Sequence, residues 1–340
     1  MSRLLIIART LSVCALLLGL TPLGLSLTLV GQDKPKEQPK ISEDEAKALQ
    51  KINAAPNTTE KTKQTVEFLK KFKKTTQRAK LADFLSNQIL GEKDANVKLK
   101  CAQDFIANFD QPGEADLIKP ALIDAYAQQN KFDEAFAEAA KYLAAQPDDV
   151  FVYTQLGYAG AQQIQKNGET WKHAKTASEY AAKAVELIEG DKKPAKTDAK
   201  YWTDYRNAWL PRAYQANGLI AYFLKDRVKA KDQLEKSAGL DQYDVTTLAL
   251  LGNIANDEYN EVAQRYQKER KSDLLDKALA HMDEVIDWYA RGVAAADGNA
   301  QLAQMSQQIM EQLKQFWGFR HDGKMDGLQA LIDKYKKPAK

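Results

Sequence analysis

Cysteine, proline and glycine are all scarce in this chain, and the scarcity of each limits the folds that the chain can adopt. Of 340 residues, two are cysteine, 10 are proline and 17 are glycine. Few prolines and glycines favour a helix-rich chain, because both residues interrupt helices. Cys14 lies in the N-terminal apolar segment, so removal of that segment would leave Cys101 alone and exclude an intramolecular disulfide. We expect Cys101 to be a small buried side chain within a helix.

The residue spacings that metal binding or nucleophilic catalysis requires are not found. His173, His281 and His321 are far apart and have no cysteine beside them, which argues against a zinc site. Residues 318–325 read GFRHDGKM and fit the start of a phosphate-binding GxxxxGK loop. However, Met325 stands where that loop needs Ser or Thr, and no strand is expected before it. We therefore expect no catalytic residue, no metal and no cofactor, and predict that the protein is not an enzyme.

Charges of both signs are interspersed along the chain. There are 49 Lys and Arg against 46 Asp and Glu, which gives a formal net charge of +3. A nucleic-acid-binding protein usually carries a basic stripe, and none is visible here. The lysine-rich stretch at residues 70–74 is typical of a solvated helix face. Nucleic acid is therefore not an expected partner.

Residues 1–31 have the pattern of a targeting segment. Arg3 and Arg9 precede an uncharged apolar run over residues 10–32. This pattern is typical of a Sec-type signal peptide, and the run is also close to the ~20 residues that span a bilayer. The segment predicts a periplasmic or secreted protein, or one that an uncleaved anchor ties to the membrane. A lipoprotein modified at Cys14 is a third option, but Val13 stands where the lipobox needs Gly or Ala.

The spacing of apolar residues predicts an all-α fold after a short linker. Residues 32–41 are polar with two prolines, as in a linker. Ser42, with Glu45 three residues later, has the pattern of a capping box that opens the first helix. Beyond this point apolar residues recur at intervals of three and four, and alternating segments are almost absent.

A repeat is the most informative pattern in the middle of the chain. Residues 116–149 read DLIKPALIDAYAQQNKFDEAFAEAAKYLAAQPDD. Its first half contains Leu122, Ala125 and Tyr126, its second half contains Phe132 and Ala135, and Pro147 marks its end. Asn130 occupies the turn between the two helices. This segment resembles a tetratricopeptide repeat, although Ile123 replaces the usual Gly and Pro120 lies early in the first helix.

Further repeats follow this segment in the sequence, and weaker repeats precede it. A second repeat starts at Val150, with a long first helix and a turn at Asn167 and Gly168; a third spans Pro211–Asp244; a fourth opens at Val245. Upstream, the pair Phe68 and Phe72 is echoed by Phe105 and Phe109, and each pair is expected to close a helix. The predicted organisation is degenerate repeats at 42–113, repeats at 114–296, and capping helices with a basic tail at 297–340.

The resemblance implies a right-handed superhelical solenoid of antiparallel helix hairpins. In this family a concave groove, lined by the first helix of each hairpin, binds peptides or protein segments. The first-helix positions that would line such a groove are Asp124, Gln128, Tyr158, Gln162, Arg212, Gln215, Tyr222, Phe223, Asn253, Asn256 and Asp257.

An aromatic stripe just before the third repeat has two interpretations. Trp202, Tyr205 and Trp209 lie at i, i+3 and i+7, on one face of a helix. They pack in the core between repeats, or they form an exposed aromatic wall for a partner.

The leading hypothesis is a non-catalytic scaffold outside the cytoplasm that binds a peptide or protein segment. The alternative is an exported small-ligand binder or enzyme with a pocket at the aromatic stripe between Tyr201 and Phe223. A purely structural spacer or self-associating scaffold is a third interpretation.

Overall fold

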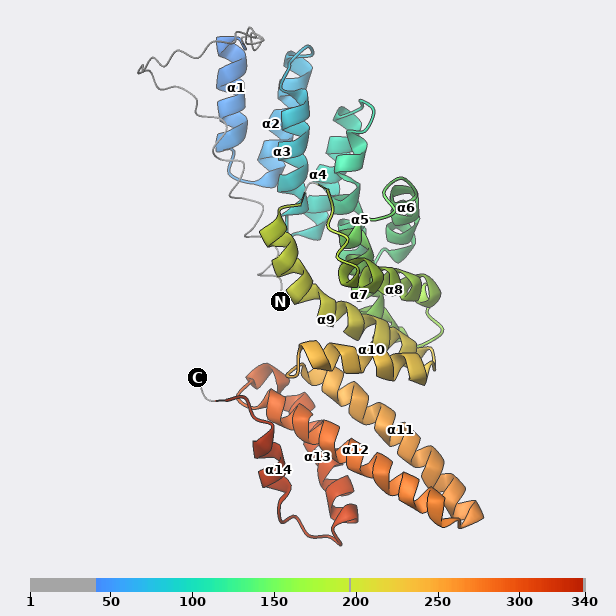
Figure 1. Cartoon of the computed structure of the whole chain (residues 1–340). Coiled ribbons are helices and arrows are strands. Elements are labelled where there is room, and N and C mark those ends of the chain that lie inside the picture. Colours follow the sequence, from blue (N-terminus) through green and yellow to red (C-terminus); the bar gives the residue numbers. More distant parts are fainter. Residues whose placement is uncertain (1–40, 196, 339–340) are drawn as a thin grey trace, which may run out of the picture. The chain divides into compact units, whose positions relative to one another are not determined.

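The structure, a computed structural model, describes residues 41–195 and 197–338, and every regular element in these ranges is a helix. The all-α prediction is therefore confirmed for this part of the chain (Figure 1). The predicted signal or anchor and nearly all of the predicted linker fall within residues 1–40, outside the described residues. None of the described helices combines the length and the apolar composition that a membrane crossing requires.

The chain divides into two compact units, Met1–Pro147 and Asp148–Lys340. Unit 1 holds six α-helices and one short 3₁₀ helix among its described residues. They are α1 (Glu43–Ala54), α2 (Thr58–Lys71), α3 (Arg78–Leu90), α4 (Ala95–Asn108), η1 (Ala115–Leu117), α5 (Lys119–Gln128) and α6 (Phe132–Ala145). Each of these α-helices packs on its neighbour in sequence, and α2 and α3 also pack on α4 and α5 respectively.

Local signals in the sequence set several helix ends in unit 1. The Ser42 side chain accepts a hydrogen bond from the Glu45 amide and caps α1, as the capping box predicts. Phe72 and Phe109 are the C-cap residues that directly follow α2 and α4. Their rings lie 4.8 Å from Phe68 and 4.2 Å from Phe105 respectively, so each echoed pair closes a helix as predicted.

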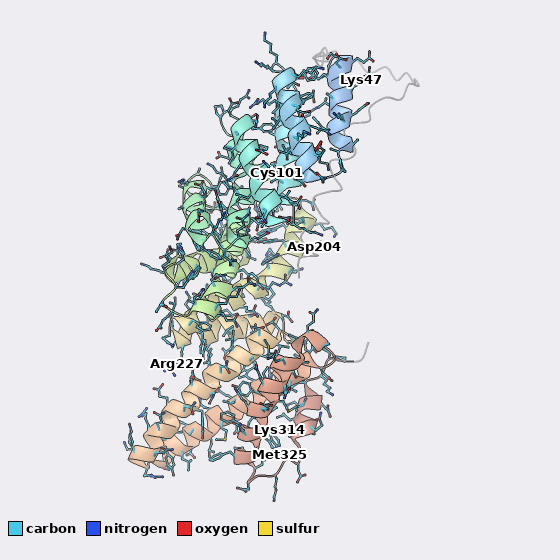
Figure 2. All side chains as sticks on the ribbon, turned by 180° about the vertical axis from the view of Figure 1, so that it is seen from behind. Lys47, Cys101, Asp204, Arg227, Lys314 and Met325 are labelled. Carbon is cyan, nitrogen blue, oxygen red and sulfur yellow. The ribbon has the colours of Figure 1, made fainter. Side chains whose placement is uncertain are left out.

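The core of unit 1 contains Cys101 and is bordered by two ion pairs. Cys101 is 2% exposed and lies among the helices of this unit (Figure 2), and burial raises the pKa of its thiol. Arg78 donates from Nε and Nη2 to the two carboxylate oxygens of Glu114, each at 2.8 Å. The Lys98 ammonium is buried against Asp124. These pairs satisfy charges that would be costly to bury alone.

Unit 2 is built from paired helices. Its described elements are α7 (Val150–Asn167), α8 (Ala174–Glu189), α9 (Ala199–Phe223), α10 (Arg227–Leu240), α11 (Val245–Glu269), α12 (Ser272–Ala296), η2 (Ala300–Leu302), α13 (Ala303–Arg320) and α14 (Leu328–Lys334). The closest pairs are α7 with α8, α9 with α10 and α11 with α12. The last pair is drawn in shades of orange in Figure 1, with its two helices side by side. In addition, α9 packs on both α7 and α11, while α13 and α14 cover α12.

Glycines on the first helix of each pair let the second helix approach closely. A Cβ at Gly157 would lie 2.7 Å from the Cα of Ala181, and one at Gly218 would lie 2.7 Å from Leu234. A Cβ at Gly252 would lie 2.3 Å from the ring of Tyr289. Real Cβ atoms do not tolerate such distances, so any larger residue at these positions forces the helices apart or displaces the neighbouring side chain.

The helix that contains Pro211 begins earlier than the sequence suggested. Pro211 was expected to open it, but α9 starts at Ala199 and contains Pro211 in its interior. Asp198 caps this helix by accepting from the Tyr201 amide at 2.9 Å. The Ser237 hydroxyl donates to the Pro211 carbonyl at 2.9 Å, which ties the proline region of α9 to α10.

Candidate binding recess on unit 2

A recess of ≈ 530 Å³ lies where the end of α9 meets the middle of α11. We call it the α9–α11 recess. It is lined by Tyr222, Phe223, Lys225, Arg227, Asp257, Asn260, Glu261 and Gln264. Tyr222, Phe223 and Asp257 are three of the predicted groove residues, so the structure brings these three together from two first helices.

The turn between α9 and α10 shapes one side of the recess. α9 ends at Phe223, and Lys225 then takes a left-handed conformation with φ of 65°. The next helix starts at Arg227, whose exposed side chain is labelled in Figure 2. Arg227 reaches α11 and donates to Glu261 at 2.9 Å. Lys225 and Arg227 therefore place two basic side chains at the edge of the recess. The acidic and amide side chains at this edge come from α11.

Tyr222 and Asp257 connect the two first helices directly. The Tyr222 hydroxyl donates to Asp257 Oδ2 at 3.2 Å. Burial and the neighbouring Asp257 charge both raise the pKa of Tyr222, so its hydroxyl stays a donor at neutral pH. The Phe223 ring stands edge-on to that of Tyr222, with centroids 5.7 Å apart. The recess thus offers an aromatic surface beside groups that donate and accept hydrogen bonds.

Of four other predicted groove residues on α9 and α11, Gln215 and Asn253 connect two helices, whereas Asn256 and Arg212 contact residues of their own helix. Gln215 donates to Asp244 and, at 2.9 Å, to Thr247 Oγ1 on α11. Asn253 accepts from the Tyr289 hydroxyl at 2.8 Å. Because Tyr289 is buried, Asn253 contributes to the packing of α11 on α12. Asn256 accepts from Asn260 at 3.0 Å, and Asn260 lines the recess. Arg212 lies over the Trp209 ring, 5.3 Å from its centroid.

The remaining predicted groove residues lie outside the recess. Tyr158 and Gln162 are on α7, where Tyr158 stands edge-on to Trp209 with centroids 5.9 Å apart and Gln162 is exposed. Asp124 and Gln128 are on α5 of unit 1, where Gln128 donates to Asp124 at 2.8 Å.

Most of the aromatic stripe is packed in the core of unit 2. Trp202 and Tyr205 are 4% and 6% exposed, and only Trp209 is half-buried. Tyr205 stacks between Trp202 and Trp209 at 5.8 and 5.9 Å, and Phe151 of α7 stands edge-on to it at 4.8 Å. The Trp202 indole N–H donates to Asp191 at 2.6 Å. These contacts leave no open aromatic surface at Trp202 or Tyr205.

Sequence reasoning missed two sets of polar residues in unit 2. Lys225, Arg227 and Glu261 line the recess but lie outside the positions that the repeat pattern marks. Within the described ranges, one group of histidine and carboxylate side chains is close enough to hold a metal ion, namely Glu258, His281 and Glu284. The spacing of His281 and Glu284, three apart on one helix, was the only signal in the sequence for that group.

No protein-family model matches the chain, and a search of the curated proteins finds no similar one. The functional reading therefore depends on the repeat pattern of the sequence and on the geometry of the recess.

Proposed function

We propose that the protein is a non-catalytic scaffold that binds a polypeptide segment outside the cytoplasm. Its helix hairpins would form a solenoid like that of tetratricopeptide repeats, and the α9–α11 recess would be part of the binding groove. The proposal combines the repeat pattern, the export pattern of residues 1–31 and the recess.

The way helices pair in unit 2 supports a repeat of this type. Gly157, Gly218 and Gly252 each lie on the first helix of a pair and meet the second helix at close range. The first helices also contact one another, since α9 packs on both α7 and α11. Hairpins that cannot bury their apolar faces alone stack in this manner. In unit 1, Asn130 takes the left-handed turn conformation, with φ of 58°, between α5 and α6.

The observation that carries the proposal is the composition of the recess. Tyr222 and Phe223 offer aromatic faces, while Asp257, Asn260 and Gln264 offer side chains that can bond a peptide backbone or its polar side chains. Aromatic anchors surrounded by polar groups are typical of surfaces that bind polypeptides. A volume of ≈ 530 Å³ can take one or two side chains of a bound segment.

Binding of peptides from an unbiased array tests the proposal. Full-length protein is screened against the array, and the affinities of the selected peptides are then measured by fluorescence anisotropy. For Phe223→Ala combined with Asp257→Asn we expect affinity to fall at least about tenfold, which is the usual loss at an interface anchor.

Leu240→Ala is the matched control for this test. Leu240 is 56% exposed and ends α10, about 20 Å along the helix from Arg227. Circular dichroism must show that all variants keep their helices. Peptides that bind the double variant as tightly as the wild type would exclude the recess as the binding surface.

A further inference from the structure

Three helices of unit 2 bring one histidine, two glutamates and one lysine to a single point. Lys231 comes from α10, Glu258 from α11, and His281 and Glu284 from α12. The Lys231 ammonium lies 3.1 Å from Glu258 and 3.0 Å from Glu284. The two carboxylates therefore share a cation between α11 and α12.

His281 faces the same point and makes no hydrogen bond through the ring nitrogen directed there. Its Nδ1 atom is buried and has no hydrogen-bond partner, although the side chain as a whole is 27% exposed. This nitrogen lies 3.4 Å from Glu258 Oε2 and 3.9 Å from Glu284 Oε2. Buried polar atoms normally have a partner, so this orphaned nitrogen calls for an explanation. A bound cation would supply one, because a neutral imidazole nitrogen is a metal ligand.

We propose that Glu258, His281 and Glu284 form a binding site for a divalent transition-metal ion, with zinc as the best-matched probe. One imidazole nitrogen and two carboxylate oxygens are ligands that zinc accepts, at about 2.0–2.2 Å from the ion. Donors at that distance in a tetrahedron lie about 3.3–3.6 Å from each other. The distance of 3.4 Å from His281 to Glu258 fits this range, whereas the distance of 3.9 Å to Glu284, and a spread of up to 4.8 Å among the three ligand atoms, require the carboxylates to move closer to the ion.

Three of the four side chains would bind the ion, and the Lys231 ammonium would compete with it. His281 and Glu284 are three residues apart and share one face of α12, while Glu258 approaches from α11, so the bound ion would clamp these two helices together. Lys231 has a flexible stem and holds the place of the ion when no metal is bound. A recess of ≈ 660 Å³, lined by both Lys231 and Glu258, gives the ion access and gives the displaced ammonium room. With three protein ligands, a bound zinc ion would keep a fourth coordination position for water.

Metal titration of the full-length, tag-free protein tests the site. Zinc affinity is measured by calorimetry after treatment with a chelator, and cobalt is used for its visible absorption, whose intensity reports tetrahedral coordination. We expect one ion per chain. His281→Ala should weaken binding at least about tenfold and abolish the cobalt bands, since it removes the only nitrogen ligand. His321→Ala is the control, because His321 is exposed and stacks on Trp317, and it should change nothing.

Lys231→Met distinguishes a metal site from a simple ion-pair network. It removes the competing charge while keeping most of the side-chain volume, so zinc should bind about tenfold more tightly. In an ion-pair network without metal affinity, the same change would leave two carboxylates unpaired and create no saturable binding. The proposal is overturned if the wild type shows no saturable site, if His281→Ala and His321→Ala bind alike, or if Lys231→Met fails to tighten binding.

Discussion

Replacing Gly157 by alanine tests how the helix pairs of unit 2 are held together. The added Cβ would lie 2.7 Å from the Cα and 2.9 Å from the backbone nitrogen of Ala181, and 3.1 Å from its Cβ. Two of these atoms belong to the backbone of α8, so no side chain can rotate to make room. The helices α7 and α8 must separate by several tenths of an ångström.

The magnitude follows from two opposing effects. Adding one carbon to a packed interior typically costs about 1–3 kcal/mol. Replacing glycine by alanine inside a helix contributes about 1 kcal/mol of stability in the opposite sense. Because the added Cβ meets backbone atoms of Ala181, which cannot move aside, we expect a packing cost near the upper end of this range. The free energy of unfolding of unit 2 should therefore fall by about 1–2 kcal/mol.

Tryptophan fluorescence during urea unfolding is the assay. All five tryptophans lie after residue 147, so the signal reports unit 2 alone. Gly239→Ala is the matched control: Gly239 is also within a helix, and a Cβ there would meet nothing within 4 Å. This control should be neutral or up to about 1 kcal/mol more stable than wild type. If Gly157→Ala proves as stable as Gly239→Ala, close backbone packing of α7 on α8 is refuted.

Three further predictions concern the buried groups. Burial raises the pKa of Tyr205 and Tyr289. Since tyrosines in the unfolded chain ionise near pH ~10, the stability that these two side chains contribute should be complete below that pH and fall above it, and a step in tyrosinate absorbance should accompany the loss of tryptophan fluorescence. Arg78→Met removes the ion-pair partner of Glu114, whose side chain is only 11% exposed. This change should destabilise unit 1 by about 2 kcal/mol, measured by thermal circular dichroism, while the unfolding transition seen by tryptophan fluorescence stays unchanged. Cys101 is buried and its thiol pKa is raised. Labelling by a thiol reagent should therefore be slow in the native protein and faster in the Arg78→Met variant. Equal labelling rates in the two proteins would contradict the placement of both residues in one cooperative core.

Local patterns in the sequence predicted the helices well, because caps and turns are encoded by nearby residues. α7 starts at Val150 and ends at Asn167 before Gly168, as expected, and α11 starts at Val245. The start of α9 was predicted wrongly because Pro211 was taken as a boundary. The Asp198 cap and the packing of Trp202 in the core support one further stretch of helix before it.

The site was less predictable, since it depends on contacts between helices. The repeat pattern marked Tyr222, Phe223 and Asp257, which do meet in one recess. It could not show that Arg227 would enter from the next turn. Nor could it place Glu258 beside His281, because their contact joins two long helices and depends on how those helices pack.

Site-specific photo-crosslinking in cells that produce the protein tests the binding proposal most directly. A photoreactive phenylalanine analogue is placed at Phe223 in the recess and, in a separate variant, at Leu240, which is exposed at the far end of α10. We predict one or a few defined protein adducts from position 223, lost when Asp257→Asn is added, and none of these from position 240. Identical adducts from both positions, or adducts that persist in the Asp257→Asn background, would contradict a partner-binding role for the recess.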